Sequence, residues 1–347
     1  MSARQVVETQ ISAPHSRETT VLFGHREAET ALLNAYRSGR IPHAWLIGGA
    51  KGIGKATLAY RMARFVLTHR DPLAADVQRA ESLGVAPTDP VARHIAAGAH
   101  GGLLTLERTA NDKGVMRTVI TVDETRETIS FFGSTAAAEG WRVCVVDTVD
   151  ELNSNAANAL LKILEEPPRQ SLFLLVSHAP GRVLPTILSR CRRLTLRPLA
   201  TADVIQAAAQ AASLTIDDPA LLEAAEAAEG SVARTLTLLG GDAVKLYQRT
   251  AALLATLPQV DQRELHALGD ALGGSDRVAL ATFIDSVDRW VSERLRADDA
   301  NANLPRLARL AEVWEKISRA ARDTAEYNLE RKPLVFSVFG LLAEATR

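Results

Sequence analysis

Cysteine is scarce in this sequence. The chain has two cysteines, Cys144 and Cys191, which lie far apart and form no Cys-x-x-Cys spacing. Their number excludes a disulfide framework and a zinc site built from four cysteines. We therefore expect no bound zinc, and the scarcity of cysteine fits a reducing cytosol.

An excess of charge of one sign and long apolar runs are also lacking. Lys and Arg total 40 against 41 Asp and Glu, so no overall basic field indicates nucleic acid, and any such contact must come from a local patch or from partner chains. No apolar run approaches the ~20 residues that a membrane helix needs. Residues 1–18 lack the basic-then-apolar order of a secretion signal, so we expect a soluble protein of the cytoplasm.

The length of 347 residues and the apolar content of 47% allow two or three packed domains. We predict a flexible tail over residues 1–18, an α/β domain over 19–198, a small alanine-rich helical domain over 199–241, and a separate helical domain over 242–347. The last range repeats amphipathic patterns, such as Phe283, Ile284, Val287, Trp290 and Val291 on one helix face. Residues 70–118 support no single assignment.

Strands and helices alternate in the second range. Continuous apolar runs at Trp45–Ile47, Val143–Val146 and Leu172–Val176 are typical of strands covered on both faces. Between the last two runs, a helix with an apolar face stops at Pro167-Pro168. This alternation predicts a parallel, doubly wound sheet.

A glycine-rich turn, 48-GGAKGIGKATLA-59, follows the first strand. From Gly49 to Lys55 it has the spacing G-x-x-x-x-G-K of a phosphate-binding P-loop, in which backbone N–H groups and the next helix face the phosphates and the lysine reaches the β and γ oxygens. Ser or Thr is expected next to hold Mg²⁺, but the residue is Ala56, and Thr57 follows one step, about 100°, around the helix. The alternative is a glycine-rich turn with a surface lysine.

An acidic residue at the end of the second strand run strengthens the P-loop interpretation. Asp147 follows VCVV and would hold Mg²⁺ through water; the alternative is a carboxylate that caps the next turn. In hydrolysing proteins of this architecture a Glu comes next and polarises the attacking water. Here the residue is Thr148, which cannot act as a general base near neutral pH. Asp150 and Glu151 lie in the turn beyond and need not face the phosphate.

Four arginines, Arg182, Arg190, Arg192 and Arg193, surround a short apolar helix. An arginine at a domain rim can stabilise charge on the γ-phosphate of a neighbouring subunit. From spacing alone, however, arginines that face solvent are the better interpretation.

Four segments together resemble the clamp-loader branch of AAA+ proteins, the subunits that serve bacterial DNA polymerase III. They are GHREAE (24–29), SGRIPHAWLIGGAKGIGKATLA (38–59), VVDTVDELNSNAANALLKILEEPP (145–168) and LFLLVSHAPGRVLPTILSRC (172–191). The motifs NALLKxLEEPP and LPTILSRC are highly specific to this family, whereas the P-loop alone is not. The last third of the chain matches only in helical character and in RKPLVFSVFGLLAEA.

The resemblance implies an AAA+ P-loop domain, a small helical lid and an all-α collar domain that joins a ring of five subunits. It makes Arg190 an arginine finger that acts in trans on ATP bound by the adjacent motor subunit. The nucleotide-binding residues it implies are Gly49, Gly52, Gly54, Lys55, Ala56, Thr57, Asp147 and Ser177, the last at the sensor-1 position. The implied ligand is ATP or ADP, with Mg²⁺, held without hydrolysis.

Three departures from the family pattern bear on function. Thr148 stands where motor subunits have Glu, which fits a non-hydrolysing subunit. In 230-GSVAR-234, Ala233 takes the place of the motor's lid arginine and Arg234 follows one position later. Many relatives bind zinc with four cysteines in the insertion after the P-loop helix, and this chain has none there.

The leading hypothesis is a non-catalytic ring subunit that, within a DNA-directed DNA polymerase holoenzyme, helps to load the sliding clamp onto primed DNA. The second is a self-sufficient ATPase, such as a motor subunit. A third, a DNA-binding module in its own right, finds little support in a net charge of −1.

Overall fold

The fold is described from a computed structural model that covers residues 14–109, 119–120, 122–133, 140–239, 243–273, 277–297, 304–327 and 329–346. The chain divides into two compact units. The sheet unit comprises Ser12–Ile216 and Glu229–Ala233, and the helical unit comprises Asp217–Ala228 and Arg234–Arg347. Each unit is described by itself below.

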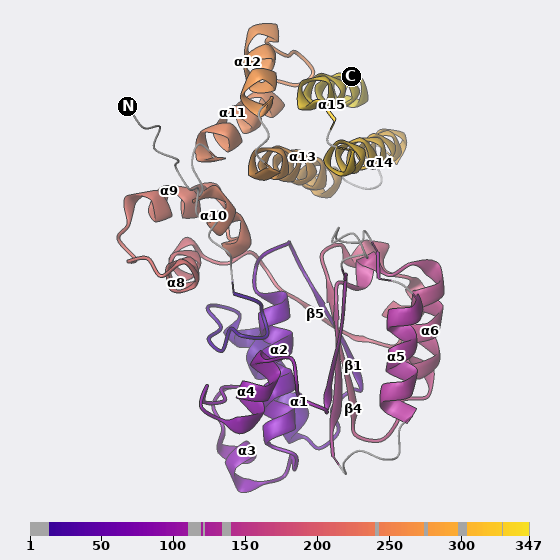
Figure 1. The fold of residues 1–347 in the computed structure, drawn as a ribbon. Helices are drawn as coiled ribbons and strands as arrows, with labels where there is room; N and C mark the ends of the chain where they lie inside the picture. Colours follow the sequence, from indigo (N-terminus) through magenta and orange to yellow (C-terminus); the bar gives the residue numbers. More distant parts are fainter. Residues whose placement is uncertain are drawn as a thin grey trace. The chain divides into compact units, whose positions relative to one another are not determined.

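The sheet unit is built on five parallel strands in the order β2-β3-β4-β1-β5 (Figure 1). The strands are β1 (Ala44–Gly48), β2 (Leu103–Glu107), β3 (Arg142–Asp147), β4 (Ser171–Ser177) and β5 (Arg192–Thr195). Because all five run in the same direction, their carboxyl ends meet at one edge of the sheet. This edge receives the glycine-rich turn.

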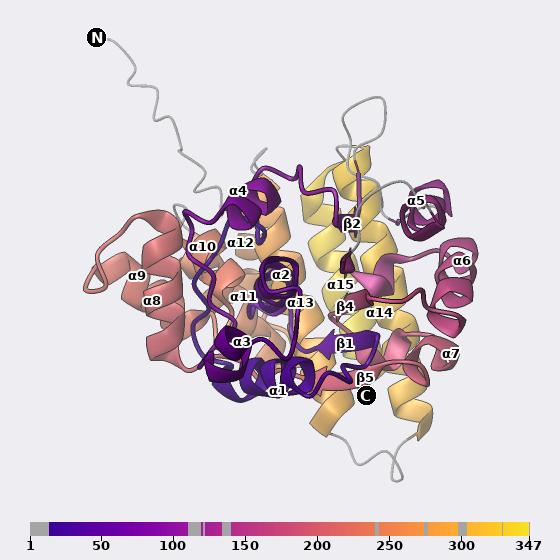
Figure 2. The same cartoon turned by 90° about the horizontal axis from the view of Figure 1, so that it is seen from below.

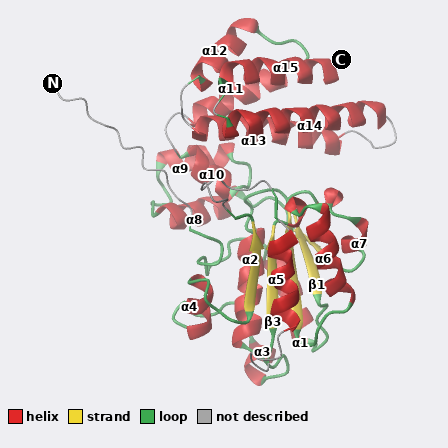
Figure 3. Cartoon of the chain, turned by 45° about the vertical axis from the view of Figure 1, so that its right-hand side comes forward, coloured by secondary structure: helices red, strands yellow, loops and turns green. Residues whose placement is uncertain are grey.

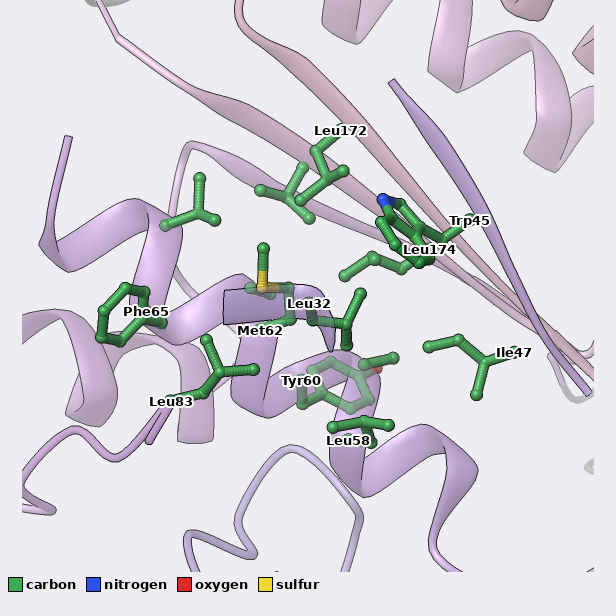
Figure 4. Packing of buried hydrophobic residues seen from close by; sticks show 14 of the residues in the cluster. Leu32, Trp45, Ile47, Leu58, Tyr60, Met62, Phe65, Leu83, Leu172 and Leu174 are labelled. Carbon is green, nitrogen blue, oxygen red and sulfur yellow. The ribbon is translucent and has the colours of Figure 1, made fainter. Parts of the chain in front are cut away.

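Helices cover both faces of the sheet (Figure 2). One face carries α1 (Arg26–Arg37), α2 (Lys55–Thr68), α3 (Ala75–Arg79) and α4 (Pro90–Ala96), and the other carries α5 (Val122–Gly133) and α6 (Ser154–Glu165). Alternate strand residues enter two separate cores: Trp45 and Ile47 pack with α2, whereas Ala44 and Leu46 pack with α6. Figure 4 shows the first core, where Leu172 and Leu174 of β4 join Leu58, Met62 and Phe65 of α2.

The predicted fold class is confirmed in the sheet unit, since the three strands expected from apolar runs and the helices that follow them are present. Strands β2 and β5 were not predicted. Strand β5 lies at a sheet edge and its sequence RRLT is mostly exposed, so it lacks the apolar run that marks a strand covered on both faces. The unassigned range 70–118 contains α3, α4 and β2.

From Thr201 onward every described element is a helix (Figure 3). These elements are α8 (Thr201–Ala212), α9 (Pro219–Ala227), α10 (Val232–Leu238), α11 (Ala243–Ala255), α12 (Gln262–Leu272), α13 (Arg277–Ala297), α14 (Leu304–Glu326) and α15 (Arg331–Thr346). In the helical unit, Phe283, Val287 and Val291 of α13 are buried, as the amphipathic pattern predicts. None of the described helices is long and apolar enough to cross a bilayer.

The four-part division into residues 1–18, 19–198, 199–241 and 242–347 stays a prediction. Most of the predicted tail lies outside the described residues, but its last part is attached to the sheet unit. His15 Nε2 lies 3.1 Å from Glu107 Oε2, and Arg64 donates hydrogen bonds to the carbonyls of Arg17 and Thr19. The boundary at 241/242 also lies outside the described residues.

Candidate functional site

The glycine-rich turn connects β1 to α2 at the carboxyl edge of the sheet. Gly54, the residue before α2, has φ +95°, which glycine adopts at little cost. No side chain caps the N-terminus of α2, so the first backbone N–H groups of this helix remain available to a ligand. The turn therefore has the conformation and the free donors of a phosphate cradle.

Lys55 is the first residue of α2 and is buried, with 3% of its surface exposed. Its ammonium donates a hydrogen bond to the carbonyl of Ala50. Burial lowers the pKa of Lys55 to about 8, against smaller raising effects of Asp147 and Asp150. A buried cation held by a main-chain carbonyl at a helix N-terminus has the donors and the charge that fit a bound phosphate.

The ends of β3 and β4 bring two further predicted residues to the same place. In the sheet register, Ser177 pairs with Gly48 and Val176 pairs with Asp147. The N–H of Gly49 donates to the carbonyl of Ser177 over 3.2 Å. Burial raises the pKa of Asp147, while the hydrogen bond from Thr148 and the charge of Lys55 lower it. The structure thus brings the turn, Asp147 and Ser177 together.

Thr148 is buried behind Asp147, with 4% of its surface exposed. Its hydroxyl donates to Asp147 Oδ1 over 3.2 Å and lies 3.4 Å from His178 Nε2. Burial, with the charges of Lys55 and Lys51, lowers the pKa of His178 to about 3. A histidine with so low a pKa is a weak general base, and a threonine hydroxyl is a poor one near neutral pH.

The arrangement fits Mg²⁺ less well than it fits phosphate. Ala56 packs against the core of the sheet unit and offers no oxygen. Thr57 is half-buried on the next position of α2 and remains the candidate hydroxyl. Among the described residues, no group of three or more His, Cys, Asp or Glu side chains is placed to hold a metal ion.

Asp150 belongs to this site, although the sequence did not place it there. Its carboxylate accepts hydrogen bonds from Ser177 Oγ at 2.6 Å, from the N–H of His178 at 2.5 Å and from the N–H of Ala179 at 3.0 Å. Its charge also acts on Lys55. The only sequence signal was the high density of acids in DTVDE, which does not say which carboxylate turns toward β4.

The turn 229–233 packs on the tip of the P-loop within the sheet unit. Ser231 Oγ donates a hydrogen bond to the carbonyl of Lys51 at 3.0 Å. The N–H of Ala233 donates to the carbonyl of Gly52 at 3.3 Å. A Cβ on Gly52 would collide with Ser231 Oγ and with the Ala233 side chain, 2.6 Å away. Position 233 therefore adjoins the P-loop.

Arg234 is engaged elsewhere. In the helical unit its Nε and Nη2 both lie 2.6 Å from Asp285 Oδ2, and its guanidinium lies 5.7 Å from the centre of the Tyr247 ring. These contacts hold the side chain on α11 and α13. Arg234, which follows Ala233 in the sequence, is thus bound to Asp285 and Tyr247 of the helical unit.

Arg190 lies at the amino ends of the strands, whereas the P-loop lies at their carboxyl ends. It precedes β5, whose first residue Arg192 pairs with Trp45, whereas the P-loop begins after Gly48 at the other end of β1. Three residues of strand separate these levels, which is roughly 10 Å. Arg190 therefore does not join the residues that could hold a nucleotide on this chain.

Protein groups at that edge hold the Arg190 guanidinium. Nη2 donates to Glu165 Oε1 at 2.7 Å, and Nη1 donates to the carbonyl of Thr186 at 2.8 Å. The side chain is still one-third exposed, at 33%. The neighbouring Arg182, Arg192 and Arg193 are exposed, and Arg192 lies over the Trp45 ring.

Comparison with known proteins gives one family. The sequence profile of the family described as DNA polymerase III, delta subunit, matches residues 24–200. These residues include the P-loop, Asp147, Ser177 and Arg190.

Two relatives illustrate the range of similarity. The DNA polymerase III subunit delta′ of Pseudomonas aeruginosa is 39% identical over 149 residues, which cover 43% of this chain and 41% of that protein. The DNA polymerase III subunit gamma/tau of Mycobacterium tuberculosis is 29% identical over 324 residues, covering 89% of this chain and 52% of that protein. The chain thus spans about half or less of the length of these relatives.

A DNA polymerase III gamma subunit-related protein from Thermotoga maritima superposes with a TM-score of 0.42 at 15% identity, covering 91% of this chain and 99% of that one.

Proposed function

Because the chain belongs to the DNA polymerase III delta subunit family of clamp-loader proteins, we propose that it is the delta′ subunit of a clamp loader. In this role it does not hydrolyse ATP. It stays in a ring of five subunits with gamma/tau and delta, and it supplies Arg190 to ATP bound by a neighbouring gamma/tau subunit. The complex then loads the sliding clamp onto primed DNA in the cytoplasm, as part of the DNA-directed DNA polymerase holoenzyme.

The position of Arg190 carries this proposal. The residue lies at the amino edge of the sheet, whereas the chain's own P-loop lies at the carboxyl edge. An arginine at the first edge cannot stabilise charge on a phosphate held at the second. It is exposed enough to meet a phosphate presented by another subunit, where such an arginine contributes a factor of about 10³ or more in rate.

The P-loop holds a nucleotide without cleaving it. Lys55 and the backbone N–H groups of the turn would bind the phosphates, and Asp147 would hold Mg²⁺ through water. A bound nucleotide would add negative charge that offsets the buried ammonium. Thr148 replaces the carboxylate that would polarise water, so the bound nucleotide is retained as a structural ligand.

The second candidate is an ATP-hydrolysing motor of the gamma/tau type. It is favoured by the long alignment with the gamma/tau relative and by a P-loop that keeps its lysine. Thr148 favours the first proposal. ATP turnover by the purified chain at ordinary ATPase rates, abolished by Lys55→Ala, would establish the motor instead.

The test of the main proposal is a reconstituted clamp loader that carries Arg190→Ala. We expect normal assembly, judged by gel filtration, and DNA-stimulated ATP hydrolysis reduced by about tenfold or more, with slower clamp loading. Arg193→Ala is the matched control, because this exposed arginine lies on β5 nearby. Unchanged hydrolysis in the Arg190 variant would remove the trans role.

A further inference from the structure

The carboxylate of Asp150 joins the turn after β3 to the end of β4. One of its oxygens accepts the Ser177 hydroxyl at 2.6 Å, and the other accepts the N–H groups of His178 and Ala179 at 2.5 and 3.0 Å. Ser177 is fully buried. Asp150 is half-buried, and its three hydrogen bonds hold the carboxylate against the end of β4.

This contact lies beside the phosphate cradle. Ser177 pairs with Gly48 in the sheet, and its carbonyl accepts the N–H of Gly49, the first residue of the P-loop consensus. The charge of Asp150 acts on the Lys55 ammonium, the group that reaches β and γ oxygens in P-loops. Ser177, with Asp150 bound to it, thus lies next to Gly48 and Gly49, where the P-loop begins.

We propose that Asp150 makes this site bind a nucleoside diphosphate in preference to a triphosphate. The inference rests on the proposed function, because it assumes that the P-loop holds a nucleotide. It identifies the resident ligand as ADP rather than ATP, and it assigns the choice to a carboxylate outside the P-loop and outside Asp147.

Two effects of Asp150 act against a third phosphate. A serine hydroxyl has one proton, and Ser177 donates it to the carboxylate, so only oxygen lone pairs face a γ-phosphate. The half-buried carboxylate would also repel the negative charge of a γ-phosphate, and repulsion between partly buried groups is screened less than at an open surface. The proposal places a γ-phosphate next to both groups, and a diphosphate would end short of them.

Substitution by asparagine separates this effect from a structural role. In Asp150→Asn, the amide oxygen can accept the N–H groups of His178 and Ala179, while the amide NH₂ donates to Ser177 Oγ. The turn is kept, the charge is removed, and the Ser177 proton becomes available to a phosphate. Glu151→Gln is the matched control: it removes a charge one residue away, from a carboxylate that Arg108 holds at 2.8 Å.

The experiment measures binding of ADP and of a non-hydrolysable ATP analogue, AMP-PNP, to the full chain by calorimetry with Mg²⁺ present. We expect the wild-type chain to bind ADP at least fivefold more tightly than AMP-PNP. Asp150→Asn should shift that ratio about tenfold toward AMP-PNP, and a second substitution, Ser177→Ala, should remove part of the gain. Glu151→Gln should leave the ratio within twofold.

Three outcomes would overturn the inference: a wild-type preference for AMP-PNP, an unchanged ratio in Asp150→Asn, or no binding of either nucleotide. The last outcome would also remove nucleotide binding from the proposed function. The trans role of Arg190 is tested separately by ATP hydrolysis on the neighbouring subunit, so the two proposals can fail independently.

Discussion

The Glu165 carboxylate binds the Arg190 guanidinium, with Oε1 2.7 Å from Nη2. Glu165 is the last residue of α6, and Arg190 follows the short helix α7 (Pro185–Leu188). The carbonyl of Thr186 accepts from Nη1, so two protein groups fix the orientation of a side chain that is otherwise long and mobile. An ion pair this exposed contributes at most about 1 kcal/mol to stability, so its effect lies in holding the arginine in place.

Removing Glu165 should slow the trans reaction without unfolding the chain. Immobilising one flexible side chain costs about 0.5–1.5 kcal/mol of free energy, and an arginine already held by Glu165 avoids that cost. Glu165→Ala should therefore lower DNA-stimulated ATP hydrolysis in the reconstituted complex about two- to tenfold. Glu165→Gln keeps an oxygen acceptor and should retain most of the activity. Glu166→Ala, which truncates the exposed neighbour, is the control, and Glu165→Ala should add nothing in an Arg190→Ala background. A further loss in that background would show that Glu165 acts by another route.

Nucleotide binding should weaken in alkaline solution. Burial lowers the pKa of Lys55 to about 8, and a bound phosphate raises that pKa by favouring the charged form. The affinity for ADP should therefore be constant below pH 8 and fall above it, by up to about tenfold per pH unit. Calorimetric titrations between pH 6.5 and 9.5 check this. The residual affinity of Lys55→Ala should show no such fall, and a flat profile in the wild type would contradict the pKa assignment.

Gly52 should be more sensitive to substitution than Gly54, although both have positive φ. Gly52→Ala places a methyl group against Ser231 and Ala233, whereas a Cβ on Gly54 finds its nearest side-chain atom at 3.7 Å. Both variants pay about 1–2 kcal/mol for the left-handed backbone, and Gly52→Ala should lose a further 1–3 kcal/mol, roughly, from the collision. Chemical unfolding measures the difference. Combining Gly52→Ala with Ser231→Gly and Ala233→Gly should recover part of it, and equal losses in the two single variants would argue against contact with the turn 229–233.

Arg234 should stabilise the helical unit and have no effect on nucleotide affinity. The side chains of its ion pair with Asp285 are 13% and 43% exposed, and Tyr247 adds a cation–π contact. Arg234→Ala should lower the free energy of unfolding by about 1–2 kcal/mol and leave ADP binding within twofold. Arg249→Ala, which breaks a more exposed pair with Glu264, is the control and should cost less. A tenfold loss of ADP affinity in Arg234→Ala would restore a sensing role.

The sequence predicted those parts of the fold that depend on local pattern. Strands β1, β3 and β4 are covered on both faces, and their apolar runs are visible without the structure. The P-loop could be placed for the same reason, since one strand, one turn and one helix contain it. Asp147 and Ser177 end neighbouring parallel strands, so a shared edge of the sheet follows from topology.

The parts that could not be predicted depend on partners far apart in the chain. Asp150 contacts a serine 27 residues later, and Glu165 contacts an arginine 25 residues later. Which of several acids turns toward a given strand is decided by the packing of the turn, and no periodicity in the sequence records it.

The exposed arginines of edge strand β5 also affect how the free chain behaves before it meets any partner. An open sheet ends in edge strands whose unpaired N–H and C=O groups can pair with strands of other molecules. On β5, Arg192 and Arg193 are exposed, and long charged side chains at such an edge oppose aggregation. The same run of arginines that includes Arg190 would thus keep newly made copies of this chain apart until they assemble.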